Sequence, residues 1–227
     1  MKSMTFSVAG FCPRTGMFGV AVSTSSLAVG SRCSWVKAKT GAALIQNYAD
    51  PSLGPVALEA LTKGNNAKET VAQMVAEGHG IAWRQIMVID KHGATAYHQG
   101  EKCLGTHGCA ETTHCIAGGN LLADASVPSA TIAGFNAANP HAHLAERLLL
   151  ALEGGLAAGG EANPVRSAHL LVADQLDWPL IDLRIDMHAQ PIAELRQVWE
   201  AFAPQAGGFV ARALNPHDAP LHGSESK

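Results

Sequence analysis

The chain has 227 residues, of which 47% are hydrophobic and 15% charged, and a net charge of −3; this composition is that of a folded globular protein and not of a disordered one. Lys and Arg are scattered instead of forming a basic stripe, which excludes nucleic acid as the expected partner. The chain has neither the ~18–20 apolar residues in a row that a membrane span needs nor an apolar signal-peptide region. No membrane partner is therefore expected, and the expected location is cytoplasmic.

The first part of the chain predicts a β-hairpin. Hydrophobic residues alternate over 5–11, residues 17–23 have the composition of a second strand, and the turn residues of 13–16 separate the two. Further along, Asn66 with Glu69 three residues later has the spacing of a capping box, which predicts the start of a helix. The other elements expected here are a buried strand at 41–46 and a helix that begins at Pro55.

The second part of the chain predicts strands, a helix pair, strands and a last helix. The expected strands are 83–90, 94–98, 114–117, 168–173 and 180–186, the expected helices are 128–138, 141–153 and one from Pro191, and residues 100–112 are rich in turns. Strands and helices that are clustered in this way favour antiparallel sheets covered by helix pairs, in an α+β fold. Residues 1–227 are expected to form one domain, with an extended tail over about 206–227.

A series of short motifs occurs in order along most of the chain. They are Thr5-Phe6-Ser7, Thr15-Gly16, Gly19-Val20-Ala21-Val22-Ser23, Ala28-Val29-Gly30, Gln46-Asn47, Asp50-Pro51, Leu53-Gly54-Pro55, Gly119-Asn120-Leu121-Leu122, the runs 144–149, 159–160 and 182–186, and Pro191-Ile192-Ala193-Glu194-Leu195. No single motif is specific. In this order, over about residues 4–203, they resemble an uncharacterised bacterial domain family of the N-terminal-nucleophile (Ntn) hydrolase superfamily. The resemblance implies a four-layer αββα sandwich, with two mainly antiparallel sheets between helix layers.

The resemblance also implies a chemistry, the hydrolysis of a small peptide-like, γ-glutamyl-like or carbamoyl amide. The first residue of the mature chain attacks the carbonyl, and its free α-amine, with a pKa of roughly 7.7–8.0, is the base. Thr5 is the residue implied, but four residues precede it. Thr5 becomes N-terminal if translation begins at Met4 and an aminopeptidase removes Met4, or if the chain cleaves itself before Thr5. Otherwise the chain is a non-catalytic, small-molecule-binding or structural member of the fold.

Several polar residues are candidates to assist Thr5. The threonine members of the superfamily use a lysine about thirty residues downstream and an acid or hydroxyl on the second strand, which implies Lys37 or Lys39 together with Ser25. The further candidates are Asn47 and Asn120 as oxyanion donors or substrate contacts, and Ser23, Asp50, His107 and Arg184 as substrate-binding residues. Each type also has an ordinary structural interpretation, as a surface lysine, a turn cap or the partner of an aspartate.

Cysteine and histidine crowd the turn-rich segment 103–115, but the paired spacings of structural zinc sites are absent. A metal-dependent protein built on this segment is therefore a third and weaker alternative, and no metal or other cofactor is expected. The five cysteines are expected to be reduced thiols, because their number is odd and no secretion signal is present. The last helix carries Trp199 and Phe202 on an apolar face, which predicts a homodimer or a larger assembly.

Overall fold

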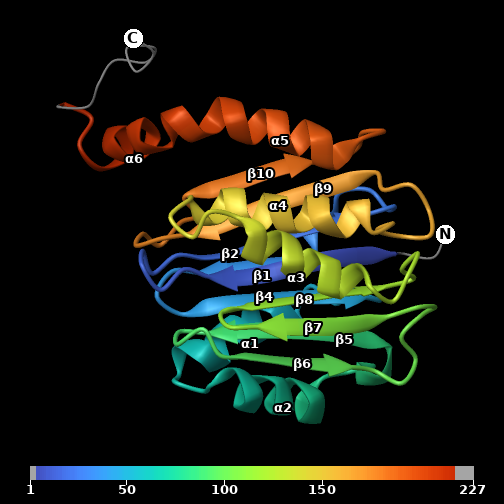
Figure 1. Cartoon of the computed structure of the whole chain (residues 1–227). Coiled ribbons are helices and arrows are strands. Elements are labelled where there is room, and N and C mark those ends of the chain that lie inside the picture. The colour runs from blue at the N-terminus through green and yellow to red at the C-terminus, as the bar shows by residue number, and fades with distance from the viewer. Residues whose placement is uncertain (1–3, 218–227) are drawn as a thin grey trace.

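The computed structural model describes residues 4–217, which form two antiparallel sheets and several helices in a mixed α+β fold (Figure 1). Neighbouring strands are antiparallel in both sheets. In spatial order the six-stranded sheet consists of β10 (Ile181–Ile185), β9 (Ser167–Ala173), β2 (Phe18–Thr24), β1 (Thr5–Phe11), β8 (Cys115–Asn120) and β7 (Gly108–Thr112). The four-stranded sheet consists of β3 (Ser34–Lys37), β4 (Gly41–Asn47), β5 (Arg84–Asp90) and β6 (Thr95–Gln99).

The predicted hairpin of β1 and β2 is confirmed and lies in the middle of the six-stranded sheet. Gly16 in its turn has φ +80°, a left-handed conformation that glycine adopts without steric cost. Side chains alternate along β1, so Phe6 and Val8 join the core under the helices while Thr5 faces the other way, toward the four-stranded sheet. The hairpin therefore presents its first residue between the two sheets.

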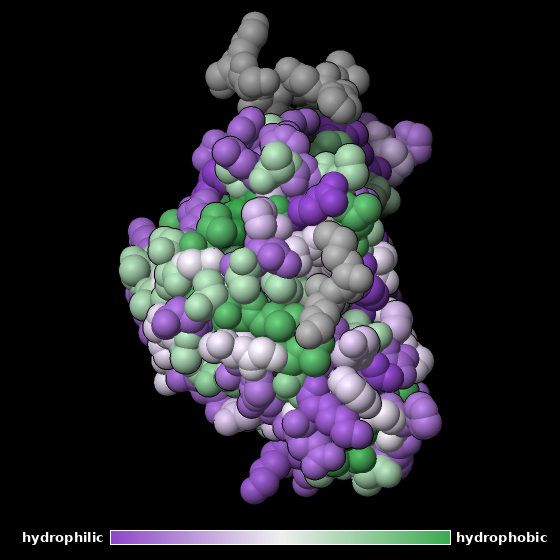
Figure 2. Space-filling model, turned by 90° about the vertical axis from the view of Figure 1, so that its right-hand side faces the viewer, coloured by the Kyte–Doolittle hydropathy of each residue, from purple (hydrophilic) through white to green (hydrophobic). Residues whose placement is uncertain are grey.

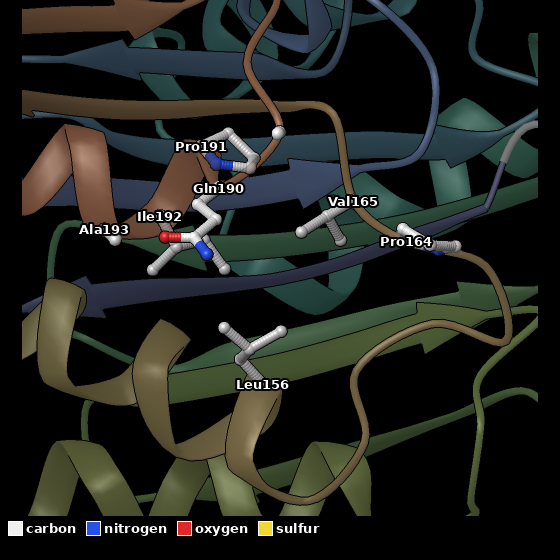
Figure 3. A pocket seen from close by; sticks show the side chains of 8 residues that line it. Leu156, Pro164, Val165, Gln190, Pro191, Ile192 and Ala193 are labelled. Atoms are coloured by element: carbon white, nitrogen blue, oxygen red, sulfur yellow. The ribbon is translucent and has the colours of Figure 1, made fainter.

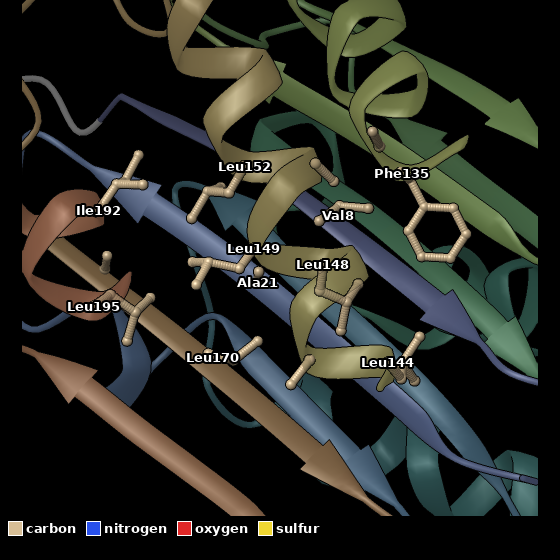
Figure 4. Close-up of a cluster of buried hydrophobic side chains, with 14 of the residues drawn as sticks. Val8, Ala21, Phe135, Leu144, Leu148, Leu149, Leu152, Leu170, Ile192 and Leu195 are labelled. Carbon is tan, nitrogen blue, oxygen red and sulfur yellow. The ribbon is translucent and has the colours of Figure 1, made fainter. Parts of the chain in front are cut away.

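Three helices cover the outer face of the six-stranded sheet, namely α3 (Val127–Ala137), α4 (Leu144–Ala157) and α5 (Pro191–Phe202). Figure 4 shows Leu148, Leu149 and Leu152 of α4 pointing onto β1 and β2. Gly19 of β2 permits this close approach, because a Cβ there would lie 2.7 Å from Leu148 Cδ1. The apolar periodicity thus predicted α4, although the helix begins three residues later than expected, where the His143 ring accepts a hydrogen bond from the Ala145 amide.

Helices α1 (Leu53–Thr62) and α2 (Ala67–Glu77) cover the outer face of the four-stranded sheet, and an apolar cluster joins the inner faces of the two sheets. The inner cluster includes Ala9 and Val20 from the larger sheet and Leu44, Met87 and Ile89 from the smaller one. Helices thus pack on each of the two antiparallel sheets.

Two edge strands and one helix were not predicted. The strands β3 and β7 have four and five residues and lie at sheet edges, where one-sided pairing leaves a weak hydrophobic pattern. Helix α6 (Ala206–Leu214) occupies the first part of the expected extended tail, so that prediction is wrong for these residues. The Gly-Gly pair inside α6 disfavours a helix locally, but Phe209 stacks on Phe202 of α5 at 5.5 Å between ring centroids. Residues 1–3 and 218–227 lie outside the described part of the chain.

The capping box at the start of α2 is confirmed and gives a direct test of the fold. Asn66 accepts from the Glu69 amide at 2.9 Å, and Glu69 accepts from the Asn66 amide at 2.9 Å. Replacing Asn66 with alanine is expected to lower the free energy of unfolding by about 1 kcal/mol, because the Glu69 amide in the first turn then has no side-chain acceptor. Urea unfolding followed by circular dichroism measures this change. Lys68→Ala, on the exposed side of the same helix, is the control; an equal loss in both variants would contradict a capping role.

Candidate functional site

Thr5 occupies the first position of β1, between two polar residues on the neighbouring strands. In the sheet register it lies opposite Thr24 of β2 and opposite Asn120 of β8. By the alternation of strand side chains, all three project from the same face, toward the four-stranded sheet. All three are buried, and Thr5 is only 1% exposed. The sequence thus builds a row of three hydrogen-bonding side chains across the central strands.

The Thr24 hydroxyl is the centre of the contacts around Thr5. Its oxygen lies 3.5 Å from the Thr5 hydroxyl and 3.1 Å from the Ser26 hydroxyl, and it donates a short hydrogen bond to the Met4 carbonyl. Ser26 in turn accepts from a terminal nitrogen of Arg32, whose guanidinium also donates to the Ala28 carbonyl at 2.9 Å. A continuous series of contacts therefore connects the Thr5 hydroxyl and the Met4–Thr5 peptide to a positive charge.

Glu161 places a buried carboxyl group beside the start of β1. The Thr24 carbonyl accepts a hydrogen bond from the Arg166 amide, so it points toward β9. Because backbone groups of successive strand residues point to opposite sides, the Ser25 amide points toward β1. In a continued ladder the Ser25 amide would donate to the Met4 carbonyl. It donates instead to Oε2 of Glu161 at 2.9 Å, while the Thr24 hydroxyl bonds the Met4 carbonyl. Glu161 thus takes the place that Met4 would have in the ladder.

The Glu161 carboxyl is poorly compensated. The residue is 5% exposed, and its Oε1 has no hydrogen-bond partner among the described residues. Burial raises the pKa of Glu161 to about 8, against the lowering effect of its hydrogen bonds with Ser25. A half-satisfied carboxyl in the interior costs free energy, so Glu161 is not explained by packing alone.

A buried polar layer lies between the sheets next to Thr5. The Ser7 hydroxyl donates to Gln46 Oε1 at 2.6 Å, Gln46 donates to Gln85 Oε1 at 2.8 Å, and Gln85 donates to the Gly119 carbonyl at 3.0 Å. The Asn120 amide also donates to Gln85 Oε1, at 3.4 Å. The layer ties the end of β1 to β4, β5 and β8 and fixes the Asn120 side chain beside Thr5.

A cavity of about 370 Å³ opens on the helix side of the same end of the sheet. Figure 3 shows three residues around it: Leu156 of α4, Val165 of the loop before β9, and Ile192 of α5. The amide next to Val165, that of Arg166, donates to the Thr24 carbonyl at 2.7 Å, which places the cavity next to β2. Figure 2 views the molecule from this end, and hydrophobic surface gathers across its middle while the lower part is mainly hydrophilic.

Comparison with known proteins identifies the family. A model of a family of unknown function, DUF1028, matches residues 5–195. The chain belongs to the DUF1028 family. The crystal structure of a DUF1028 protein from Silicibacter pomeroyi superposes with a TM-score of 0.81 at 30% identity, over 88% of this chain and 89% of that one. The Anbu (ancestral β-subunit) protein of Yersinia bercovieri is far less similar, with a TM-score of 0.37 and 11% identity over 92% and 97% of the two chains. No curated protein matches the chain.

The DUF1028 chain does not bring either candidate lysine to Thr5. Lys37 pairs with Gly41 at one end of β4, whereas Gln46, which contacts β1 near Thr5, lies five residues further along that strand. At the rise of a strand this separates Lys37 from Gln46 by about 17 Å. The Lys37 ammonium instead donates to the Thr62 hydroxyl at 3.0 Å. Lys39 lies in the turn after β3 and is exposed, so the positive charge connected to Thr5 belongs to Arg32.

The serine and asparagine candidates differ in their positions. Ser25 follows Thr24, the residue that pairs with Thr5 in the sheet, and the Ser25 amide donates to Glu161. Ser23 projects from the opposite face of β2, where its hydroxyl donates to the Ser167 carbonyl at 3.0 Å. Asn47 is near the same sheet end, but its amide donates to the Trp83 carbonyl at 2.6 Å and accepts from the Leu104 amide. Asn47 has φ +70° and joins two loops, which is the structural role of a turn residue.

Three of the expected substrate-binding residues contact partners two residues away in the chain. Asp50 accepts a hydrogen bond from the Ser52 hydroxyl at 2.6 Å. This bond, and to a smaller extent the positive charge of Arg84, lowers the pKa of the Asp50 carboxyl. His107 is half-buried and pairs within its own loop, with Nδ1 2.7 Å from the Gly105 carbonyl. Arg184 holds Asp182 with bonds of 2.7 and 2.9 Å on β10, three strand spacings or about 14 Å from β1. For Arg184 the structural pairing with an aspartate is therefore observed.

The remaining sequence predictions concern metals, membranes and thiols. Within residues 4–217, no three His, Cys, Asp or Glu side chains are arranged to hold a metal ion. The same part of the chain contains no helix that is long and apolar enough to cross a membrane. All five cysteines are free. His114 lies in a left-handed turn just before β8 and Cys115 begins that strand, buried under the helices.

Four residues that the sequence did not single out complete the site, namely Thr24, Ser26, Arg32 and Glu161. The run Ser23-Thr24-Ser25-Ser26 at the end of a strand was a usable signal, because hydroxyls clustered at a strand end are typical of a polar site. Glu161 follows the motif Gly159-Gly160, but nothing local distinguishes it from a surface glutamate. Its burial beside Ser25 is visible only in the structure.

Proposed function

We propose that this DUF1028 chain is an amide hydrolase of the Ntn type, in which Thr5 is the nucleophile after loss of residues 1–4. The order of helices, sheet, sheet and helices supports the four-layer αββα arrangement of that superfamily. The family match begins at Thr5, which supports a mature chain that starts there. The substrate is a small amide that fills the space now taken by Met4, which is 8% exposed.

The observation that carries this proposal is the environment of the Met4–Thr5 peptide. Its carbonyl accepts from the Thr24 hydroxyl, and the Thr5 hydroxyl touches the same Thr24 oxygen. A hydrogen bond to the carbonyl oxygen polarises it toward attack. Attack by the Thr5 oxygen on this carbonyl breaks the peptide C–N bond and forms an ester, while the proton of the hydroxyl passes to the leaving nitrogen. Water then hydrolyses the ester, releasing residues 1–4 and leaving a free α-amine on Thr5.

The same groups have defined roles in turnover. The free amine of Thr5 accepts the hydroxyl proton as the oxygen attacks the substrate carbonyl. The ammonium so formed pairs with Glu161, whose Oε1 has no partner in the chain that retains Met4. Asn120, on the same face beside Thr5, donates to the oxyanion together with the Thr24 hydroxyl. Collapse of the tetrahedral intermediate returns the proton to the leaving amine, and water releases the acyl group from Thr5.

A non-catalytic binding module is the alternative, and two observations favour it. Thr5 is buried behind Met4, and no lysine lies beside it in the described structure.

The sequence predicted an assembly from the aromatic residues Trp199 and Phe202. Both have partners within the chain, because Trp199 donates to Glu146 at 2.9 Å and Phe202 stacks on Phe209. We propose assembly as a homodimer or a larger oligomer, which light scattering at micromolar concentration tests.

Intact mass of protein produced in a bacterial host tests the proposed function. The mass is expected to lack residues 1–4, and Thr5→Ala is expected to retain them, because the attacking hydroxyl is gone. Met4→Leu keeps an apolar side chain in the buried position but removes the internal start. Loss of residues 1–4 from the wild type and Met4→Leu, with retention in Thr5→Ala, shows self-cleavage. Loss from the wild type and Thr5→Ala, with retention in Met4→Leu, shows initiation at Met4 with removal of that methionine. Retention of residues 1–4 in every variant would favour the binding module.

A further inference from the structure

A second cavity, of about 350 Å³, lies at the opposite end of the six-stranded sheet from Thr5. In Figure 1 this is the end to which the arrow of β1 points, away from the label N. Three segments form its walls: the β1–β2 turn, the β7–β8 turn, and α4 with the loop before it. The residues that matter for its chemistry are Phe11, Cys12, Arg14, His114, His141 and Arg147.

The cavity holds positive charge that no carboxylate compensates. Among residues 4–217, neither Arg14 nor Arg147 forms a salt bridge. Arg14 donates from one terminal nitrogen to the His141 carbonyl at 3.1 Å. The Arg147 guanidinium stacks 4.0 Å from the Phe135 ring centroid, and its Nε is buried with no acceptor in the described part of the chain. No acidic side chain lines the cavity, so two guanidinium groups face it with unused donors.

Histidine adds donors from the other walls. His114 has φ +63° and rests edge-on against Phe11 at 5.4 Å between ring centroids. Its Nδ1 is buried against Gly93 and has no hydrogen-bond partner among the described residues, so Nε2 is the ring nitrogen available to a ligand. His141 contributes a second ring from the loop before α4. Donors that converge from three segments fit the four oxygens of a tetrahedral anion better than the two oxygens of a flat carboxylate.

The pKa of the Cys12 thiol also indicates a positive environment in this cavity. Burial by itself would raise the pKa of this thiol, but hydrogen bonds with Thr15 and the Arg14 amide, together with the charge of Arg14, lower it below its usual value. Burial raises the pKa values of Cys33, Cys103, Cys109 and Cys115. Cys12 is thus the cysteine whose surroundings stabilise a negative charge, and it lines this cavity.

We propose that this cavity is a binding site for a phosphate group, either free phosphate or the phosphate of a small ester, held by Arg14, Arg147 and His114. The guanidinium groups supply charge-assisted hydrogen bonds, and Phe11 with the two prolines of the walls leaves room for a small organic part. The site is separate from Thr5 and does not depend on amide hydrolysis.

Isothermal titration calorimetry on the full chain, in a phosphate-free buffer of constant ionic strength, tests this site. Inorganic phosphate is expected to bind saturably at one site per chain. Arg14→Gln and Arg147→Gln are each expected to weaken binding by about tenfold or more, because each removes a charged donor. Arg166→Gln removes an exposed arginine at the other end of the sheet and is expected to bind like the wild type. Arg14 is exposed, so Arg14→Gln carries the test even where Arg147→Gln reduces folding.

Further arms of the titration identify the source of the phosphate. Tighter binding of glycerol 3-phosphate than of inorganic phosphate supports an ester ligand, and the reverse order supports free phosphate. Absence of saturable binding in the wild type, or equal affinity in the wild type and both arginine variants, would overturn the site. Tighter binding of succinate than of either phosphate would overturn the assignment to phosphate.

Discussion

Replacing Thr5 with alanine is expected to reduce amide hydrolysis by about 10⁴-fold or more, because the chain then has no nucleophile at the start of β1. The substitution removes one hydroxyl and one methyl group from a strand end. The expected loss in free energy of unfolding is therefore small, about 1 kcal/mol. Initial rates on a panel of small peptide-like, γ-glutamyl-like and carbamoyl amides measure the first effect, and urea unfolding measures the second.

Two variants separate loss of the nucleophile from loss of structure. Thr5→Ser keeps a hydroxyl and is expected to retain measurable activity. Thr131→Ala removes an equally buried threonine, whose hydroxyl donates to the Val127 carbonyl inside α3, and is expected to retain full activity. Turnover by Thr5→Ala at the wild-type rate, with an active Thr5→Ser, would show that Thr5 is not the nucleophile.

Glu161→Gln is expected to change how stability depends on pH in the chain that retains Met4. The pKa of Glu161 rises from an ordinary 4.5 to about 8 on folding, so between these values the folded chain holds a proton that the unfolded chain has lost. The free energy of unfolding contributed by this group therefore falls as pH rises from 4.5 to 8, by on the order of 5 kcal/mol in total. Glu161→Gln lacks this fall, and should be the more stable protein at pH 9.

Urea unfolding at pH 5, 7 and 9 measures this difference when both proteins also carry Thr5→Ala, which is expected to retain residues 1–4, and intact mass confirms that these residues are present. Glu200→Gln, an exposed substitution on α5, is the control and should follow the wild type at each pH. In a chain that begins at Thr5, the new ammonium lowers the pKa of Glu161 and the pH dependence should shrink. Parallel curves for wild type and Glu161→Gln at every pH would mean that Glu161 is not a strained buried acid.

Local sequence patterns predicted the parts of the fold that depend on local contacts. Alternation placed Thr5 at the start of a strand and Phe6 and Val8 on a buried face, and both features are present. The capping residues placed the start of α2 correctly. In each of these cases the interactions join neighbours in the chain or follow from strand and helix periodicity.

The site itself depends on contacts that the sequence does not encode locally. Ser25 and Glu161 are 136 residues apart in the chain, and only the paths of β8, α3 and α4 bring them together. The offset from Thr5 to Lys37 implied a contact, but β3 carries Lys37 to the far end of β4. Sequence spacing fixes a spatial distance only inside one regular element.

The glutamine layer between the sheets has a consequence for how the sheets can align. Apolar faces such as those of Val20 and Met87 tolerate sliding, because methyl groups have no directional partners. The amide groups of Gln46 and Gln85 do have directional partners, and each donor in the series already has its own acceptor. A slip by one residue would leave several buried amide groups without partners, at about 1–3 kcal/mol each. The observed alignment of the two sheets is therefore far more stable than an alignment shifted by one residue. The same hydrogen bonds fix the position of β1 relative to β4.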